Sequence, residues 1–291
     1  MKMNAMKTIK IGGVPEHFNL AWYLGLKNGD FKKAGINLRW KDYFGGTGEM
    51  CKALRDKEID LAVILTEGIT KDIIAGNPCK IVQVFVKSPL IWGIHVSHNS
   101  KYRTIEDLKG SKAAISRFGS GSHLMAYVNA KNNHWKLNSY LDFEIVQDLN
   151  GAVQSLTNKS SDYFMWEKFT TKPLVDNNTF RRIGECPSPW PCFVIAVRDE
   201  FLETNKDYLK TILDIINSIT TQFKEIPDID VRIAKRYSQQ LNDVKQWLNI
   251  TEWSQSTISE TTMHTVQDQL FSLNIIPEKW KYEQLVASLN N

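Results

Sequence analysis

Short apolar segments alternate with amphipathic segments along the chain, and this alternation constrains the fold more than any other feature. In the first 90 residues, the strand-like segments are 8–13, 37–43, 61–65 and 80–86. The segment LAVIL at 61–65 is apolar throughout, which is typical of a parallel strand buried on both faces. Helical periodicity separates these segments, first over 19–34, where Gly35 is placed to cap the helix. This β-α-β-α order predicts a doubly wound parallel sheet.

The alternation starts again after Pro89. The predicted strands of this second part are 91–96, 112–115, 143–146, 163–165 and 181–185, and 192–197 is predicted to be a return strand. The chain beyond Asp199 is almost wholly helical, over 202–223, 228–240 and 256–273, and is expected to pack on the first lobe. We therefore predict two doubly wound α/β lobes joined by two hinge crossings. Residues 1–90 with 193–291 form the first lobe, and residues 91–192 form the second.

Composition excludes several classes of protein. Of 291 residues, 42% are hydrophobic and 23% charged, and the net charge of +4 is scattered, which disfavours nucleic acid as a partner. No apolar run has the length of a membrane span, so no membrane insertion is expected. The N-terminus lacks the apolar core of a secretory signal, so the sequence as it stands predicts a cytoplasmic protein, or a periplasmic one if a signal was removed. We expect a monomer.

The four cysteines, Cys51, Cys79, Cys186 and Cys192, form neither a CxxC motif nor a zinc-ligand spacing. No metal site and no cofactor are therefore predicted. Cys186 and Cys192 are close enough in sequence to pair, but we expect reduced, partly buried thiols.

Candidate site residues follow the predicted strands, because ligands of open α/β sheets bind beyond the carboxyl ends of the strands. The strongest element is SRFGSGSHLMA at 116–126. Its glycines allow close approach to a ligand, Ser120 or Ser122 can cap the next helix beside Gly121, and Arg117 can bind a carboxylate or phosphate. The alternative is an ordinary capped helix start with Arg117 in solvent.

Other loops add polar and aromatic groups. Gly46 and Thr47 lie in a Gly-rich turn that is neither a Walker A loop nor a GxGxxG motif. Trp166 can stack on a ligand ring while Glu167 accepts its N–H groups, or the pair can be a core tryptophan and a helix-start carboxylate. The remaining candidates are Glu16, His17, Glu67 and Trp190. No motif specifies a reaction, so no catalytic residue is assigned.

The segments VPEHF, FGGTG, KALRDKEIDLAVILTEG, DLKGSKAAISRFGSGS and DYFMWEKFTTK occur in this order. Together they resemble the periplasmic-binding-protein-like family related to nitrate, sulfonate and taurine binding proteins and to the thiamine-pyrimidine group. The resemblance is to a branch shared by fungi and bacteria that often lacks a signal peptide, and it covers roughly residues 8–200. It implies a type II fold with the ligand between the lobes. The implied contacts are Glu16, His17, Gly46, Thr47, Glu67, Ser120, Gly121, Trp166 and Glu167.

The sequence thus predicts a solute-binding protein that closes on a small polar ligand, of the ABC-transporter type or an intracellular relative. Carboxylates and Arg117 together favour a zwitterion or an amino-heterocycle, and an ABC permease is a candidate partner. One alternative is an enzyme resembling thiamine-pyrimidine synthases, which needs iron or pyridoxal phosphate and has Lys71 and His17 as candidates. The stretch CPSPWPCF at 186–193 has fewer cysteines than the motif of those synthases, which counts against it. The other alternative is a cytoplasmic ligand sensor.

Overall fold

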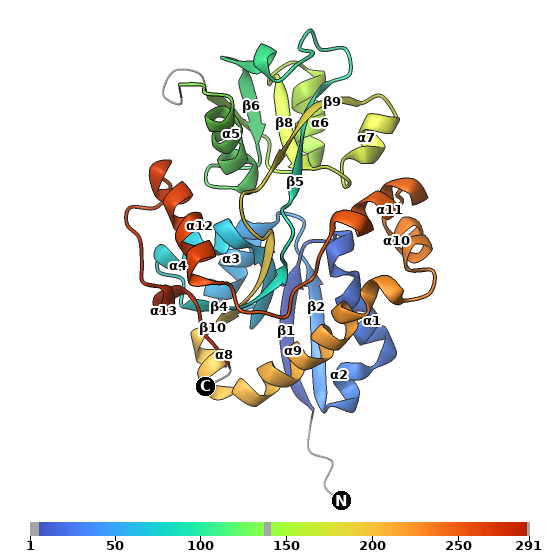
Figure 1. Cartoon of the computed structure of the whole chain (residues 1–291), viewed down its shortest axis with the longest axis vertical. Helices are drawn as coiled ribbons and strands as arrows, with labels where there is room; N and C mark the ends of the chain where they lie inside the picture. Colours follow the sequence, from blue (N-terminus) through green and yellow to red (C-terminus); the bar gives the residue numbers. More distant parts are fainter. Residues whose placement is uncertain (1–5, 137–140, 290–291) are drawn as a thin grey trace, which may run out of the picture. The chain divides into compact units, whose positions relative to one another are not determined.

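The computed structural model describes residues 6–136 and 141–289. By its internal contacts the chain divides into two compact units, Met1–Ser88 with Trp190–Asn291, and Pro89–Pro189. The chain passes into the second unit after Ser88 and returns at Trp190. Each unit is an α/β structure with one five-stranded sheet in its described part (Figure 1).

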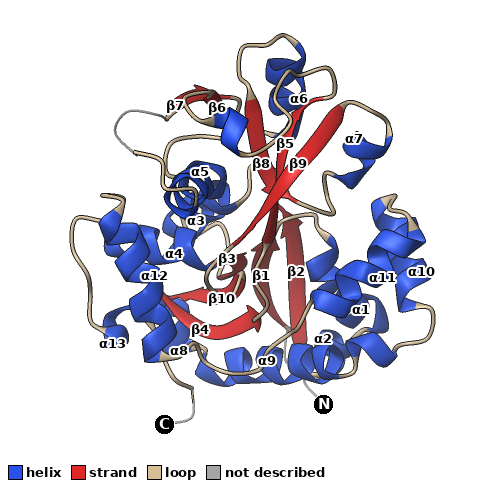
Figure 2. Cartoon of the chain, turned by 45° about the horizontal axis from the view of Figure 1, so that its top comes forward, coloured by secondary structure: helices blue, strands red, loops and turns tan. Residues whose placement is uncertain are grey.

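The sheet of the first unit has the strand order β2-β1-β3-β10-β4 (Figure 2). Its strands are β1 (Lys7–Gly13), β2 (Ile36–Asp42), β3 (Leu61–Leu65), β4 (Cys79–Val86) and β10 (Phe193–Arg198). β1 is parallel to β2 and β3, whereas β10 is antiparallel to β3 and β4. The returning chain is antiparallel because it re-enters beside the end of β4, where the Cys192 N–H donates to the Ser88 carbonyl at 3.2 Å. The predicted return strand is thus confirmed, and it makes the predicted parallel sheet a mixed one.

Helices surround this sheet. They are η1 (His17–Asn19), α1 (Leu20–Asn28), α2 (Asp30–Lys33), α3 (Thr47–Arg55), α4 (Thr66–Ile74), α8 (Asp199–Thr204), α9 (Lys206–Thr221), η3 (Phe223–Glu225), α10 (Ile229–Tyr237), α11 (Leu241–Ile250), α12 (Glu260–Ser272) and α13 (Tyr282–Leu285). The helical C-terminal segment packs on the first unit as predicted, with α9 against α1 and α12 against α4. The prediction of one helix over 19–34 is wrong. Gly29 takes the left-handed conformation, with φ of 73°, and ends α1 before α2 begins.

The second unit repeats the arrangement in the order β7-β6-β8-β5-β9. Its strands are β5 (Ile91–Ser97), β6 (Lys112–Ile115), β7 (Asp142–Ile145), β8 (Tyr163–Glu167) and β9 (Phe180–Pro187). Its helices are η2 (Glu106–Leu108), α5 (Gly121–Asn132), α6 (Leu149–Thr157) and α7 (Lys172–Asp176). β6 is parallel to β7 and β8, and β5 is antiparallel to β8 and β9. Two α/β units, each with one antiparallel strand in an otherwise parallel arrangement, confirm the predicted fold class.

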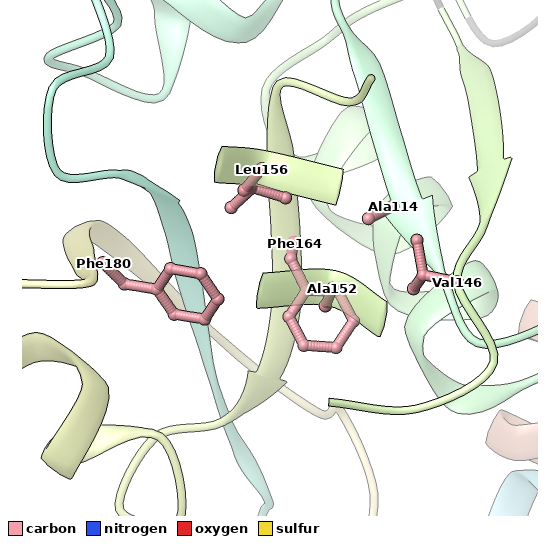
Figure 3. Packing of buried hydrophobic residues seen from close by; sticks show 6 residues of the cluster. All are labelled: Ala114, Val146, Ala152, Leu156, Phe164 and Phe180. Carbon is pink, nitrogen blue, oxygen red and sulfur yellow. The ribbon is translucent and has the colours of Figure 1, made fainter. Parts of the chain in front are cut away.

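A hydrophobic cluster fills one side of the second sheet (Figure 3). Its buried members are Ala114, Val146, Ala152, Leu156, Phe164 and Phe180. They come from β6, β8, β9, α6 and the segment after β7, so the cluster joins most elements of the unit. Burial of these side chains is therefore a main source of the stability of the second unit.

Candidate functional site

Two loops at the carboxyl ends of strands in the first unit touch each other. Gly46, with φ of 67°, turns the chain after β2, and α3 starts at Thr47. α4 starts directly after β3, at Thr66. A Cβ atom on Gly68 would lie 2.3 Å from Thr47 Cγ2, so the two helix starts approach this closely because residue 68 has no side chain. The predicted site residues Thr47 and Glu67 therefore lie at two helix starts that contact each other through Thr47 and Gly68.

The carboxylate of Glu67 is buried and already has a partner. The Trp190 indole N–H donates to Glu67 Oε2 at 2.8 Å. The Thr66 hydroxyl donates to the Pro191 carbonyl at 2.5 Å, and the Thr66 N–H donates to the Cys192 carbonyl at 3.1 Å. The start of α4 thus holds three consecutive residues where the chain re-enters the first unit. Burial raises the pKa of Glu67 to about 7, and the bond from Trp190 opposes that rise.

Replacing Glu67 with glutamine should remove a pH dependence of the stability of the first unit. The pKa of Glu67 is about 7 in the folded chain against an ordinary value of 4.5, so the folded state holds a proton that the unfolded state has released between these values. The free energy of unfolding should therefore fall as pH rises from 4.5 to 7, by about 3 kcal/mol. Glu67→Gln should match the wild type at pH 4 and exceed its stability at pH 8, as measured by urea unfolding.

The matched control is Glu203→Gln, because Glu203 is an exposed carboxylate of the same unit. It should leave the pH profile unchanged. A Glu67→Gln profile parallel to the wild-type profile would show that Glu67 does not titrate in this range.

His17 is buried in an aromatic cluster. Its ring centroid lies 4.3 Å from that of Trp247, in an edge-on arrangement, and 4.8 Å from that of Phe18. Tyr237 lies at 6.0 Å, and Gln239 Nε2 lies 3.4 Å from His17 Nδ1, within hydrogen-bonding distance. Burial lowers the pKa of His17 to about 3, so the ring is neutral at pH 7. This side chain fixes the turn after β1, in which Glu16 lies half-buried.

The C-terminal helices supply residues that sequence reasoning did not find. Besides Tyr237, Gln239 and Trp247, the Arg236 guanidinium lies 3.8 Å from the centroid of the Tyr23 ring. The Tyr23 hydroxyl in turn donates at 2.5 Å to Asp42, the last residue of β2. The C-terminal helices thus support the carboxyl end of β2. No local motif marks these residues, because they act through contacts with loops far away in the sequence.

In the second unit, the predicted Ser-Gly turn is organised by its own hydroxyl groups. The Ser116 N–H donates to Ser122 Oγ at 3.0 Å, and the hydroxyl oxygens of Ser120 and Ser122 lie 3.1 Å apart. Ser120 is the N-cap of α5, and its oxygen accepts the His123 N–H at 3.3 Å. Both serines are buried, whereas Gly121 and Arg117 are half-buried. The capping role predicted for Ser120 or Ser122 belongs to Ser120.

Trp166 and Glu167 lie inside a strand, not beyond its end. β8 extends to Glu167, so the prediction of a strand over 163–165 alone is wrong. The Trp166 ring stacks on Phe164 at 5.3 Å, packs against the hydrophobic cluster and remains half-buried. The buried Glu167 carboxylate accepts the Thr170 N–H at 2.6 Å and so fixes the turn after β8. Burial raises the pKa of Glu167, while backbone hydrogen bonds from Thr170 and Phe169 lower it.

Comparisons with known proteins show which proteins this chain is similar to. Residues 92–186 match the model of the Ca3427-like periplasmic-binding-protein family. The Candida albicans CA3427 gene product, described as exhibiting the generic periplasmic-binding-protein fold, is 26% identical. The alignment covers 94% of this chain and 92% of that one, with a TM-score of 0.86. This chain has the type II periplasmic-binding-protein fold.

Two further solved structures share the fold at lower identity. The alkanesulfonate-binding protein SsuA from Xanthomonas axonopodis pv. citri, bound to MOPS, is 14% identical with a TM-score of 0.82, over 99% of this chain and 100% of that one. The ligand-binding component of an ABC-type import system from Staphylococcus aureus, with zinc bound, is also 14% identical with a TM-score of 0.78, over 97% of each chain. A search of curated protein sequences gave no significant match. The resemblance predicted from the sequence is confirmed.

The remaining reactive groups of this periplasmic-binding-protein-like chain are dispersed. All four cysteines are buried, and none is in a disulfide. Within residues 6–136 and 141–289, no three His, Cys, Asp or Glu side chains gather in a way that could hold a metal ion. Lys71 lies in the last turn of α4, and His17 is enclosed by aromatic rings. No helix within the described ranges combines the length and apolar character that a membrane span needs.

Proposed function

We propose that this chain is a solute-binding protein whose two units close on a small polar ligand. The observation that carries the proposal is the similarity to the CA3427 protein over 94% of the chain, at a TM-score of 0.86. It is supported by the loops at the carboxyl strand ends of each unit, which carry buried, hydrogen-bonded polar groups. We take the units Met1–Ser88 with Trp190–Asn291, and Pro89–Pro189, as the two lobes.

The candidate residues have two roles in this proposal. Those that are half-buried are proposed to contact the ligand: Glu16, Gly46, Thr47, Arg117, Gly121 and Trp166. Those that are buried are proposed to hold the contact loops in place: His17, Glu67, Ser120, Ser122, Glu167 and Trp190. Their hydrogen bonds to neighbouring loops are the reason for the second assignment, because a preorganised loop loses less entropy when a ligand binds.

The proposed ligand is a small zwitterion or amino-heterocycle. Glu16 supplies a carboxylate for its positive part, while Arg117 and the start of α5 suit its anionic part. The SsuA relative is bound to MOPS, which is itself a zwitterion with a heterocyclic amine and a sulfonate. An ABC permease is the proposed partner if the protein is exported, and an intracellular carrier or sensor role is proposed if it is not.

A thermal-shift screen with MOPS, taurine, arginine and thiamine tests this function. A ligand that binds only the folded chain should stabilise it by about 2.7 kcal/mol at a free concentration of about 100 times Kd. Arg117→Ala should weaken binding by roughly tenfold or more, because the anionic part loses its charged partner. Arg103→Ala, which removes an exposed arginine of the same unit, should not. Chemical turnover of a compound that does not stabilise the chain would contradict the proposal.

A further inference from the structure

A cavity of about 360 Å³ lies within the second unit. It lies at the amino ends of the parallel strands, whereas the candidate site residues of this unit lie at their carboxyl ends. Asp162, directly before β8, accepts the N–H of Lys112, the first residue of β6, at 2.8 Å. Ser97 ends the antiparallel strand β5 at this same end of the sheet. Glu167, at the other end of β8, is five residues after Asp162, and this stretch of strand spans about 16 Å. The cavity is therefore separate from the loops that carry Arg117 and Glu167.

The lining of the cavity has an excess of positive charge and of hydrogen-bonding groups. Lys101 and Lys159 contribute two exposed ammonium groups, and Asp162 contributes the single carboxylate of the lining. The Asp162 carboxylate is already engaged by the Lys112 N–H. Within the described part of the chain, no acidic side chain forms an ion pair with Lys159. The hydroxyls of Ser97 and Ser100 and the amide of Asn99 add neutral donors, whereas the buried Ser161 hydroxyl lies 2.7 Å from that of Ser155.

One wall of the cavity is held in place by Arg181 of β9. Its guanidinium donates to the carbonyl oxygens of His98 at 2.7 Å, Ser100 at 2.9 Å and Tyr102 at 2.6 Å. Three bonds from one planar group fix the backbone of the loop that carries Lys101. The wall is thus preformed, which lowers the entropic cost of binding a ligand.

The cavity also has an apolar part. Leu156 lines it, although this member of the hydrophobic cluster is only 1% exposed, and the centroid of the half-buried Tyr102 ring lies 5.1 Å from Lys101 Nζ. A volume of this size is in the range of small-molecule sites. Two ammonium groups suit a doubly charged anion, and the apolar part suits a short carbon chain attached to it.

We propose that this cavity is a second ligand site, which binds a small phosphate monoester with its phosphate between Lys101 and Lys159. It is distinct from the site of the proposed solute, and its occupancy stabilises the second unit because the ligand binds only the folded unit. The phosphate interacts with the ammonium groups and the hydroxyls, and the carbon chain contacts the ring of Tyr102.

The test is a titration of the ¹⁵N-labelled chain with glycerol 3-phosphate, followed by amide NMR at constant ionic strength. Signals of residues 97–102 and 159–162 should shift in a saturable way. Inorganic phosphate, which has no carbon chain, should bind more weakly at the same signals. The double variant Lys101→Ala with Lys159→Ala should weaken binding by roughly tenfold or more, because both cationic partners are lost.

The matched control is Lys136→Ala, since Lys136 is an exposed lysine of the same unit that does not line the cavity. It should leave the affinity unchanged. The proposal is overturned if millimolar glycerol 3-phosphate causes no saturable shift, or if the double variant and the control bind equally well. Equal affinity for inorganic phosphate would overturn the role of the apolar part. None of these outcomes depends on whether the first site binds a solute.

Discussion

Phe164→Ala should destabilise the second unit by about 3–5 kcal/mol. Phe164 lies on the central strand β8, is 0% exposed, and packs with residues of α6 and β9 in the hydrophobic cluster (Figure 3). Truncation removes its transfer free energy and leaves a cavity between elements that are fixed by the sheet. Urea unfolding, with hydrogen exchange to separate the two units, measures the effect.

The matched control is Phe118→Ala, in the same unit, because this ring is 61% exposed. It should change the free energy of unfolding by no more than about 0.5 kcal/mol. Equal losses in the two variants would show that Phe164 is not part of a close-packed core.

Acidification from pH 7 to pH 4 should destabilise each unit through the titration of a buried histidine. His17 in the first unit and His95 in the second have pKa values lowered to about 3 by burial, against an ordinary value of 6.5. Their contribution to stability is complete above pH 6.5 and is lost as pH falls toward 3, because only the unfolded chain takes up the proton. At pH 4 the loss is about 3 kcal/mol for each histidine.

Single variants His17→Asn and His95→Asn separate this titration from packing. Each should be less stable than the wild type at pH 7, since His17 packs against Trp247 and His95 Nε2 is hydrogen-bonded to Thr171 at 2.9 Å. Each should nevertheless lose about 3 kcal/mol less than the wild type between pH 7 and pH 4, and only in its own unit. Measuring the pH dependence of both variants in a Glu67→Gln background removes the titration of Glu67, which has the opposite effect on stability. An unchanged pH dependence in these variants would contradict the assignment of buried neutral histidines.

Much of the fold could be predicted from the sequence because the signals for it are local. The continuous apolar run at Leu61–Leu65 identified a strand buried on both faces, and the serines at 120 and 122 identified the start of a helix. The position of β10 between β3 and β4 had no such signal, since strand order depends on contacts between distant segments. The break at Gly29 was missed because the apolar periodicity continues across it. The left-handed conformation of Gly29, which ends the helix, leaves no mark in that periodicity.

The candidate site was less predictable, because the sequence shows which residues follow a strand but not which distant residues they contact in the folded chain. Glu67 was correctly placed at the end of β3, yet its partner Trp190 lies 123 residues away. His17 meets Gln239, which lies 222 residues away in the helical tail. The sequence therefore predicted which polar residues lie at strand ends, whereas their burial and their long-range partners, on which the proposed division into contact and loop-supporting residues rests, came from the structure.

Small-angle X-ray scattering at increasing ligand concentration tests the central proposal most directly. The ligand is the compound that gives the largest thermal shift. A solute-binding protein whose two units close on the ligand should show a radius of gyration that falls with ligand concentration and reaches a plateau at saturation. The Arg117→Ala variant should need a higher concentration to reach the same plateau. A radius of gyration that stays constant while the bound ligand saturates the chain would contradict closure.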